Sequence, residues 1–113
     1  MITLVPLRNS KIAENFAYAN EFIFLDEQGN IEAEITTPSD NGLDPTYELK
    51  LAELIGAFNS CRILVREINL SMAILFEEHG AIICRIGDDI KFLHDLRLNN
   101  NYQSYPSICS WAS

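Results

Sequence analysis

The run Cys61–Val65 constrains the fold more than any other part of the sequence. It is a continuous apolar run centred on Ile63, Leu64 and Val65. Such a run is typical of a central strand that is covered on both of its faces. Segments with helical periodicity precede and follow it, so we expect helices to pack over a sheet that contains this strand.

The segment before this strand has the signals of a helix. Asp44-Pro45 opens it, with Asp44 as the N-cap and Pro45 at the first helical position. Apolar residues then recur at helical spacing and predict one stripe that faces the core: Tyr47, Leu51, Leu54, Ile55 and Phe58.

Two further helices are predicted after the central strand. The first begins near Asn69 or Ser71 and ends at Gly80, because a residue without a Cβ can take the left-handed conformation of a C-cap. The second begins at Gly87-Asp88 and continues through Ile90, Leu93 and Leu96.

Four other segments are predicted to be strands. Ile2–Leu7 and Ala81–Arg85 are short buried runs. Glu21–Asp26 and Ile31–Thr37 form a hairpin around a turn at Gln28-Gly29-Asn30. Ile31–Thr37 alternates apolar and polar residues, which is typical of a strand with one dry and one wet face. We therefore expect this strand at an edge of the sheet.

The order of these elements predicts the fold class. Strands that are separated by helices need crossover connections, so the sheet is largely parallel with an antiparallel hairpin strand. Right-handed crossovers are expected to put helices on both faces. The prediction is a three-layer α/β domain of ribonuclease H-like topology, with a five-stranded mixed sheet, over residues 1–98. Residues 99–113 are predicted to be a polar C-terminal tail.

Composition excludes several classes of function. The net charge of −8 argues against a nucleic-acid partner, because phosphate contacts need a basic face. The three cysteines include no CxxC pair, which argues against a disulfide framework and a structural zinc site. Cys61 and Cys84 lie in predicted strands and are expected to be core residues. Neither a membrane span nor a signal peptide is evident, so we expect a soluble cytoplasmic protein.

The residue pattern also argues against an enzyme. A metal-dependent nuclease of this topology needs carboxylates on its central strands, and neither Ile2–Val5 nor Ile63–Val65 contains an acid. The sequence has no glycine-rich phosphate loop and no spacing typical of a nucleophile and its base. We therefore expect a non-enzymatic protein.

Two stretches resemble a known family. Asn15–Phe24 resembles the His-Phe-Gly-x-Ala-x-x-Phe-x-aromatic stretch of NifX-like proteins. These proteins form the dinitrogenase iron–molybdenum cofactor-binding family, which includes the C-terminal domain of NifB. Glu48–Gly80 is similar to the other half of the family pattern: a helix, a strand opened by Cys61, and a helix that ends in Glu77-Glu78-His79-Gly80-Ala81. The resemblance covers roughly residues 1–98.

The resemblance implies a carrier or chaperone of nitrogenase maturation. Its cargo is expected to be the iron–molybdenum cofactor or its iron–sulfur precursor, and its partners are expected to be nitrogenase or the cofactor-assembly proteins. Asn15 stands where the family motif has histidine, and Ala17 where it has glycine. An asparagine amide is a poor ligand for such a metal centre, which prefers thiolate and imidazole.

Basic residues indicate where an anion would bind. Arg8 and Lys11 follow the first strand and Arg66 follows the central one, and ligands of open parallel sheets gather outside the carboxyl ends of strands. The N-terminus of the helix that follows also favours an anion. The predicted binding set is Arg8, Lys11, Asn15, Arg66, Asn69 and Ser71, with no metal-ligating residue. The alternative is that these are scattered surface charges.

Two functions therefore remain open. The first is a NifX-like carrier that holds an anionic metallocluster in the loops of residues 8–15 and 66–71. The second is a diverged interaction protein that keeps the fold, binds no cluster and docks on nitrogenase or its assembly proteins. The substitution of histidine by Asn15 favours the second function, and the basic loops favour the first.

Overall fold

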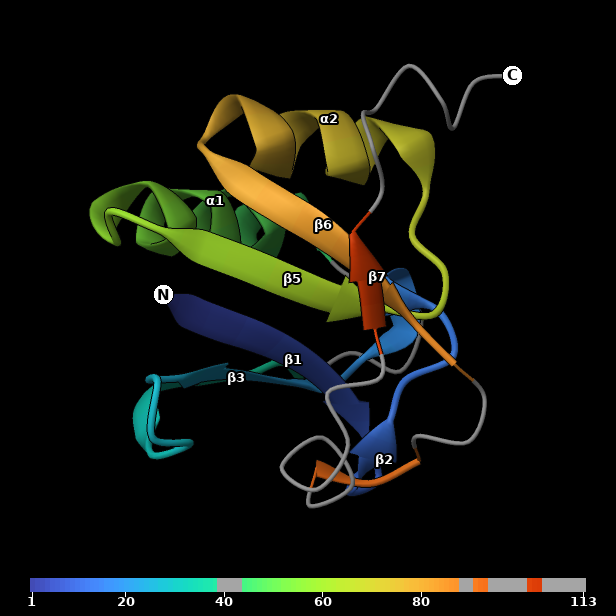
Figure 1. Ribbon diagram of the computed structural model, residues 1–113. Coiled ribbons are helices and arrows are strands. Elements are labelled where there is room, and N and C mark those ends of the chain that lie inside the picture. Colours follow the sequence, from blue (N-terminus) through green and yellow to red (C-terminus); the bar gives the residue numbers. More distant parts are fainter. Residues whose placement is uncertain (39–43, 88–90, 94–101, 105–113) are drawn as a thin grey trace.

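The computed structural model describes residues 1–38, 44–87, 91–93 and 102–104 (Figure 1). These residues form an α/β fold in which two helices pack on a mixed sheet. Its strands and helices are β1 (Ile2–Arg8), β2 (Lys11–Ile12), the 3-10 helix η1 (Phe16–Tyr18), β3 (Glu21–Leu25), β4 (Ile31–Thr36), α1 (Pro45–Ala57), β5 (Cys61–Val65), α2 (Leu70–Glu78), β6 (Ala81–Ile86) and β7 (Tyr102–Ser104).

The sheet confirms the predicted mixture of strand directions. Its order is β4-β3-β1-β5-β6-β7, with β2 paired to β1. β1, β5 and β6 are parallel, whereas β3 and β4 form an antiparallel hairpin beside β1. As predicted, the hairpin strand β4 lies at one edge. Its turn is closed by the Asp26 carboxylate, which accepts hydrogen bonds from the backbone N–H groups of Gln28 and Asn30 at 2.9 Å each.

Among the described residues the sheet has seven strands, not the five that were predicted. One addition is β2, which returns from β1 through a turn at Asn9 and Ser10. The other is β7, which lies within the segment taken as a polar tail and pairs antiparallel with β6. The rest of that segment lies outside the described residues.

Side-chain caps fix both helix starts, as the sequence predicts. The Asp44 carboxylate accepts a hydrogen bond from the N–H of Thr46 at 2.7 Å, ahead of Pro45. The Asn69 side chain accepts one from the N–H of Met72 at 2.9 Å. Such caps satisfy N–H groups that have no partner within the helix. Gly80 follows α2 with a φ of +96°, the left-handed conformation expected there.

Both described helices lie on the same face of the sheet, so the prediction of helices on both faces is wrong for them. Figure 1 shows α1 and α2 side by side over this face, and Leu51, Ile55 and Phe76 join one core cluster beneath them. The physical reason is the strand order. β1, β5 and β6 follow one another in a single direction, so successive crossovers of the same hand return over the same face. The third predicted helix lies mostly outside the described residues.

A second core cluster occupies the opposite face of the sheet. Alternate residues of the same strands form it, among them Val5, Ile23, Leu64 and Cys84. Leu93 packs against this cluster from the segment after β6. Leu93 therefore covers part of the face that α1 and α2 leave open. None of the described helices combines the length and apolar character needed to cross a membrane.

Candidate functional site

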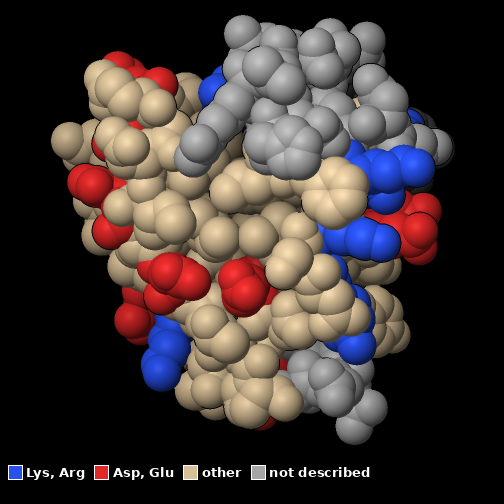
Figure 2. All heavy atoms as spheres, turned by 90° about the horizontal axis from the view of Figure 1, so that it is seen from below, with Lys and Arg blue, Asp and Glu red and all other residues tan. Residues whose placement is uncertain are grey.

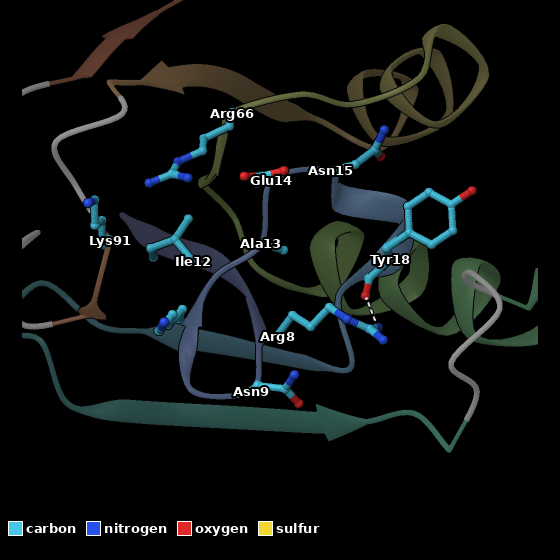
Figure 3. A pocket seen from close by; sticks show the side chains of 10 residues that line it. Arg8, Asn9, Ile12, Ala13, Glu14, Asn15, Tyr18, Arg66 and Lys91 are labelled. Carbon is cyan, nitrogen blue, oxygen red and sulfur yellow. Dashed lines mark hydrogen bonds between the residues drawn. The ribbon is translucent and has the colours of Figure 1, made fainter.

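A pocket of about 650 Å³ opens beyond the carboxyl ends of β1 and β5 (Figure 3). Its volume falls within the range of about 300–1,000 Å³ that is usual for small-ligand sites. The residues that line it are Arg8, Asn9, Lys11, Ile12, Ala13, Glu14, Asn15, Tyr18, Arg66 and Lys91. Four of the six residues predicted to bind a ligand are therefore brought together: Arg8, Lys11, Asn15 and Arg66.

A tight turn places the first two basic residues. Asn9 and Ser10 both have positive φ, at 52° and 69°. Two such residues suit the twist of a two-residue hairpin loop, and they set Arg8 and Lys11 opposite each other on β1 and β2. One guanidinium nitrogen of Arg8 donates a hydrogen bond to the carbonyl oxygen of Tyr18 at 2.7 Å. Figure 3 shows this contact at the side of the pocket where Tyr18 lies.

A backbone contact joins the two loops that form the rest of the pocket. The N–H of Phe16 donates to the carbonyl oxygen of Glu67 at 2.8 Å, and Asn15 and Glu67 form a parallel bridge. The Phe16 ring is fully buried, with ring centroids 5.0 Å from Phe22 and 5.3 Å from Phe76. The anchored ring holds this loop beside the residue that follows β5, which is Arg66.

The Asn15 side chain has a structural partner. Its oxygen accepts a hydrogen bond from the N–H of Ala17 at 3.0 Å and so caps η1. Asn15 lines the pocket while this oxygen is engaged in the cap. The amide is therefore a positioning group of the loop and a weak choice of metal ligand.

Asn69 and Ser71 do not line the pocket. The Asn69 side chain accepts hydrogen bonds from the N–H of Met72 at 2.9 Å and from the hydroxyl of Ser71 at 3.0 Å. These bonds form the N-cap of α2, so both side chains stabilise the start of this helix. The structure thus separates them from the other four predicted residues.

Lys91 also lines the pocket, and it was not among the residues predicted to bind a ligand. Its carbonyl oxygen accepts a hydrogen bond from the N–H of Ile12 at 2.8 Å, which brings the segment after β6 against β2. No sequence pattern indicates this pairing, because it joins residues that are 79 positions apart through a single bond. The rule that ligand-binding residues directly follow strands therefore could not predict Lys91.

The pocket concentrates positive charge on an acidic chain. Arg8, Lys11, Arg66 and Lys91 line it, and they are four of the chain's eight basic residues. Figure 2 shows most of the basic side chains on the face in view gathered at one side, with some acidic atoms beside them and the other acidic side chains spread elsewhere. At physiological ionic strength, the interaction between charges is screened over about 8 Å. A ligand in the pocket is therefore affected more by these four nearby basic groups than by the net charge of −8 of the whole chain. The pocket is therefore suited to an anion.

The described thiols lie away from this pocket. Cys61 and Cys84 are buried in the sheet, and burial raises the pKa of the Cys61 thiol from 9.0 to about 11. Cys61 is thus a protonated core residue at neutral pH. In the part of the chain that the structure describes, no group of three or more His, Cys, Asp or Glu side chains is placed to hold a metal ion.

The fold is shared with solved structures of low sequence identity. One is a "putative dinitrogenase (mj0327)" from Methanocaldococcus jannaschii, with a TM-score of 0.65 and 12% identity over 95% of this chain and 96% of that one. Another is PH0822, with a TM-score of 0.62 and 13% identity over 96% and 97% of the two chains. A third is a "putative NifB protein" of the DUF35 family from Thermotoga (TM1290), with a TM-score of 0.59 and 16% identity over 94% of each of the two chains. No family model and no curated protein matches the chain significantly by sequence.

Proposed function

We propose that this protein is a non-enzymatic, NifX-like carrier of nitrogenase maturation that holds an anionic metallocluster in the basic pocket. The observation that carries the proposal is the convergence of Arg8, Lys11, Arg66 and Lys91 around one cavity. The cargo is the iron–molybdenum cofactor or its iron–sulfur precursor. The likeness in fold to proteins described as a dinitrogenase and a NifB protein supports this choice of cargo.

Retention of the cargo is electrostatic in this proposal. Soft metal centres prefer thiolate and imidazole ligands, and the described lining residues include neither cysteine nor histidine. Arginine and lysine instead supply charged N–H donors that bind the anionic surface of a cluster. Each exposed contact contributes about 1 kcal/mol or less, so several are needed and the complex stays reversible. Reversibility suits a protein that passes its cargo to nitrogenase or to a cofactor-assembly protein.

Anaerobic gel filtration tests this proposal. The chain is mixed with isolated iron–molybdenum cofactor at low salt, and molybdenum is measured in the protein peak. We expect the wild type to retain molybdenum and the double variant Arg8→Ala/Arg66→Ala to lose most of it. Lys50→Ala is the matched control, because Lys50 lies on α1, away from the pocket, with its ammonium 5.2 Å from the Tyr47 ring centroid. Circular dichroism of each variant confirms that it is folded.

The second candidate function is a docking protein that binds no cluster. The cap made by Asn15 and the absence of a metal-binding group from the described residues favour it. If the wild type retains no molybdenum but co-elutes with nitrogenase or an assembly protein, the carrier proposal is wrong and the docking function replaces it.

A further inference from the structure

One carboxylate lies among the basic residues of the pocket. Glu14 is the single acidic residue among the described residues that line it. Glu14 also lines a smaller neighbouring pocket of about 240 Å³, together with Arg66, Glu67, Arg85 and Ile86. Glu14 and Arg66 are therefore shared by the two pockets, and Figure 3 shows them next to each other.

The backbone on both sides of Glu14 is fixed. The N–H of Ala13 donates to the carbonyl oxygen of Pro6 at 3.0 Å, and the N–H of Phe16 donates to that of Glu67 at 2.8 Å. Ala13 and Phe16 are both buried. The loop therefore holds the Glu14 Cα beside the cavity that its side chain lines.

This carboxylate has opposite effects on the empty and the occupied pocket. It attracts the surrounding cations when no ligand is bound, and it repels an anion that enters. The repulsion is proportional to the charge of the ligand, so a dianion loses about twice the binding free energy that a monoanion of the same size loses.

We propose that Glu14 limits the charge of the anion that this pocket retains and keeps its affinity low enough for release. This inference rests on the proposed function, that the pocket binds an anionic cargo. Glu14 is then a specificity-determining residue, because it favours an anion whose charge is spread over a large surface above a small, highly charged one.

Two tetrahedral oxyanions of similar size but different charge test the role of Glu14. Perrhenate carries one negative charge and molybdate carries two. Dissociation constants are measured by isothermal titration calorimetry at low salt for the wild type and Glu14→Gln. We expect Glu14→Gln to bind perrhenate about threefold more tightly and molybdate about tenfold more tightly, since the gain grows with the ligand charge. The matched control is Glu53→Gln, because Glu53 is an exposed residue of α1 that lines neither pocket, and we expect it to leave both constants unchanged.

The ratio of the gains in affinity for molybdate and perrhenate shows whether Glu14 discriminates between ligands by their charge. An equal gain for both oxyanions, or the same gains in Glu53→Gln, overturns the proposed role. If Arg8→Gln weakens both complexes while Glu14→Gln changes neither, Glu14 has no such role and the anion site itself stands. If the wild type binds neither oxyanion at any salt concentration and retains no cofactor, the proposed function and this inference both fail.

Discussion

The backbone N–H of Phe16 donates a hydrogen bond to the carbonyl oxygen of Glu67 at 2.8 Å. This contact joins the loop after β2 to the loop after β5, and each loop contributes to the basic pocket. Asn15 precedes the donor and Arg66 precedes the acceptor, so the bond sets how far apart the two sides of the pocket lie. Core packing of the Phe16 ring thereby determines the shape of a site at the surface.

Phe16→Ala should therefore be strongly destabilising. The ring is fully buried between Phe22 and Phe76, and removal of such a ring costs about 3–5 kcal/mol in unfolding free energy. Urea unfolding measures this loss. Tyr18→Ala on the same 3-10 helix is the control, because its ring is 53% exposed and its loss should cost about 0.5 kcal/mol or less. Equal losses in the two variants would contradict this description of the core.

Ser10→Gly should raise the stability of the hairpin that presents Arg8 and Lys11. Ser10 has a φ of 69°, a conformation that costs an ordinary residue about 1–2 kcal/mol and glycine almost nothing. The greater freedom of glycine in the unfolded chain offsets part of this, so we expect a net gain of about 0.5 kcal/mol in thermal or urea unfolding.

The same substitution within a helix provides the control for Ser10. Ser71→Gly lies in the first turn of α2, where glycine should cost up to about 1 kcal/mol. A loss of stability in both variants would show that Ser10 is not strained.

The raised pKa of Cys61 predicts a loss of stability in alkaline solution. The thiol ionises near 9.0 in the unfolded chain and near 11 in the folded one, so between these values the folded state binds more protons. The contribution to stability is full below pH 9 and is lost as the pH rises to 11. The loss is about 3 kcal/mol at most. The unfolding free energy of Cys61→Ala, measured with urea, should lack this part of the pH dependence. If the unfolding free energy of both proteins changed equally between pH 9 and 11, the raised pKa of Cys61 would be refuted.

Local signals in the sequence predict most of the elements, because each acts on neighbouring residues. The cap at Asp44, the cap at Asn69 and the end of α2 at Gly80 all lie where such signals placed them. The turn at Asn9 and Ser10 has no such signal, since neither residue is the glycine that usually marks positive φ. Strand order is a property of the whole sheet and has no local signal. The prediction of helices on both faces was therefore wrong for α1 and α2.

Most of the candidate site was predictable from residues that follow strands, and Asn15 was predicted from the family resemblance. Arg8, Lys11 and Arg66 converge because parallel strands end at one edge of the sheet. Asn69 and Ser71 were included for the helix N-terminus, but their side chains bond to each other and to the start of α2. Lys91 was missed, because its position depends on a single tertiary bond to Ile12.

Asn15→His should convert part of the electrostatic retention into coordination. An imidazole at this position of the pocket wall is a suitable ligand for an iron centre, and a coordinate bond is not screened by salt. We expect isolated cofactor to bind the variant more tightly and with a weaker salt dependence than it binds the wild type. The cost is the cap on η1, about 1 kcal/mol of stability. Unchanged salt dependence would show that position 15 does not face the bound cluster.

The salt dependence of cofactor binding tests the central claim most directly. Dissociation constants of isolated iron–molybdenum cofactor are measured anaerobically between ~0.05 and ~0.3 M salt for the wild type, Arg8→Ala/Arg66→Ala and the control Lys50→Ala. The electrostatic account predicts that the double variant binds about tenfold more weakly or worse, that added salt weakens the wild type similarly, and that Lys50→Ala behaves as the wild type. A double variant that binds like the wild type, or a wild type that binds nothing at any salt concentration, would contradict it.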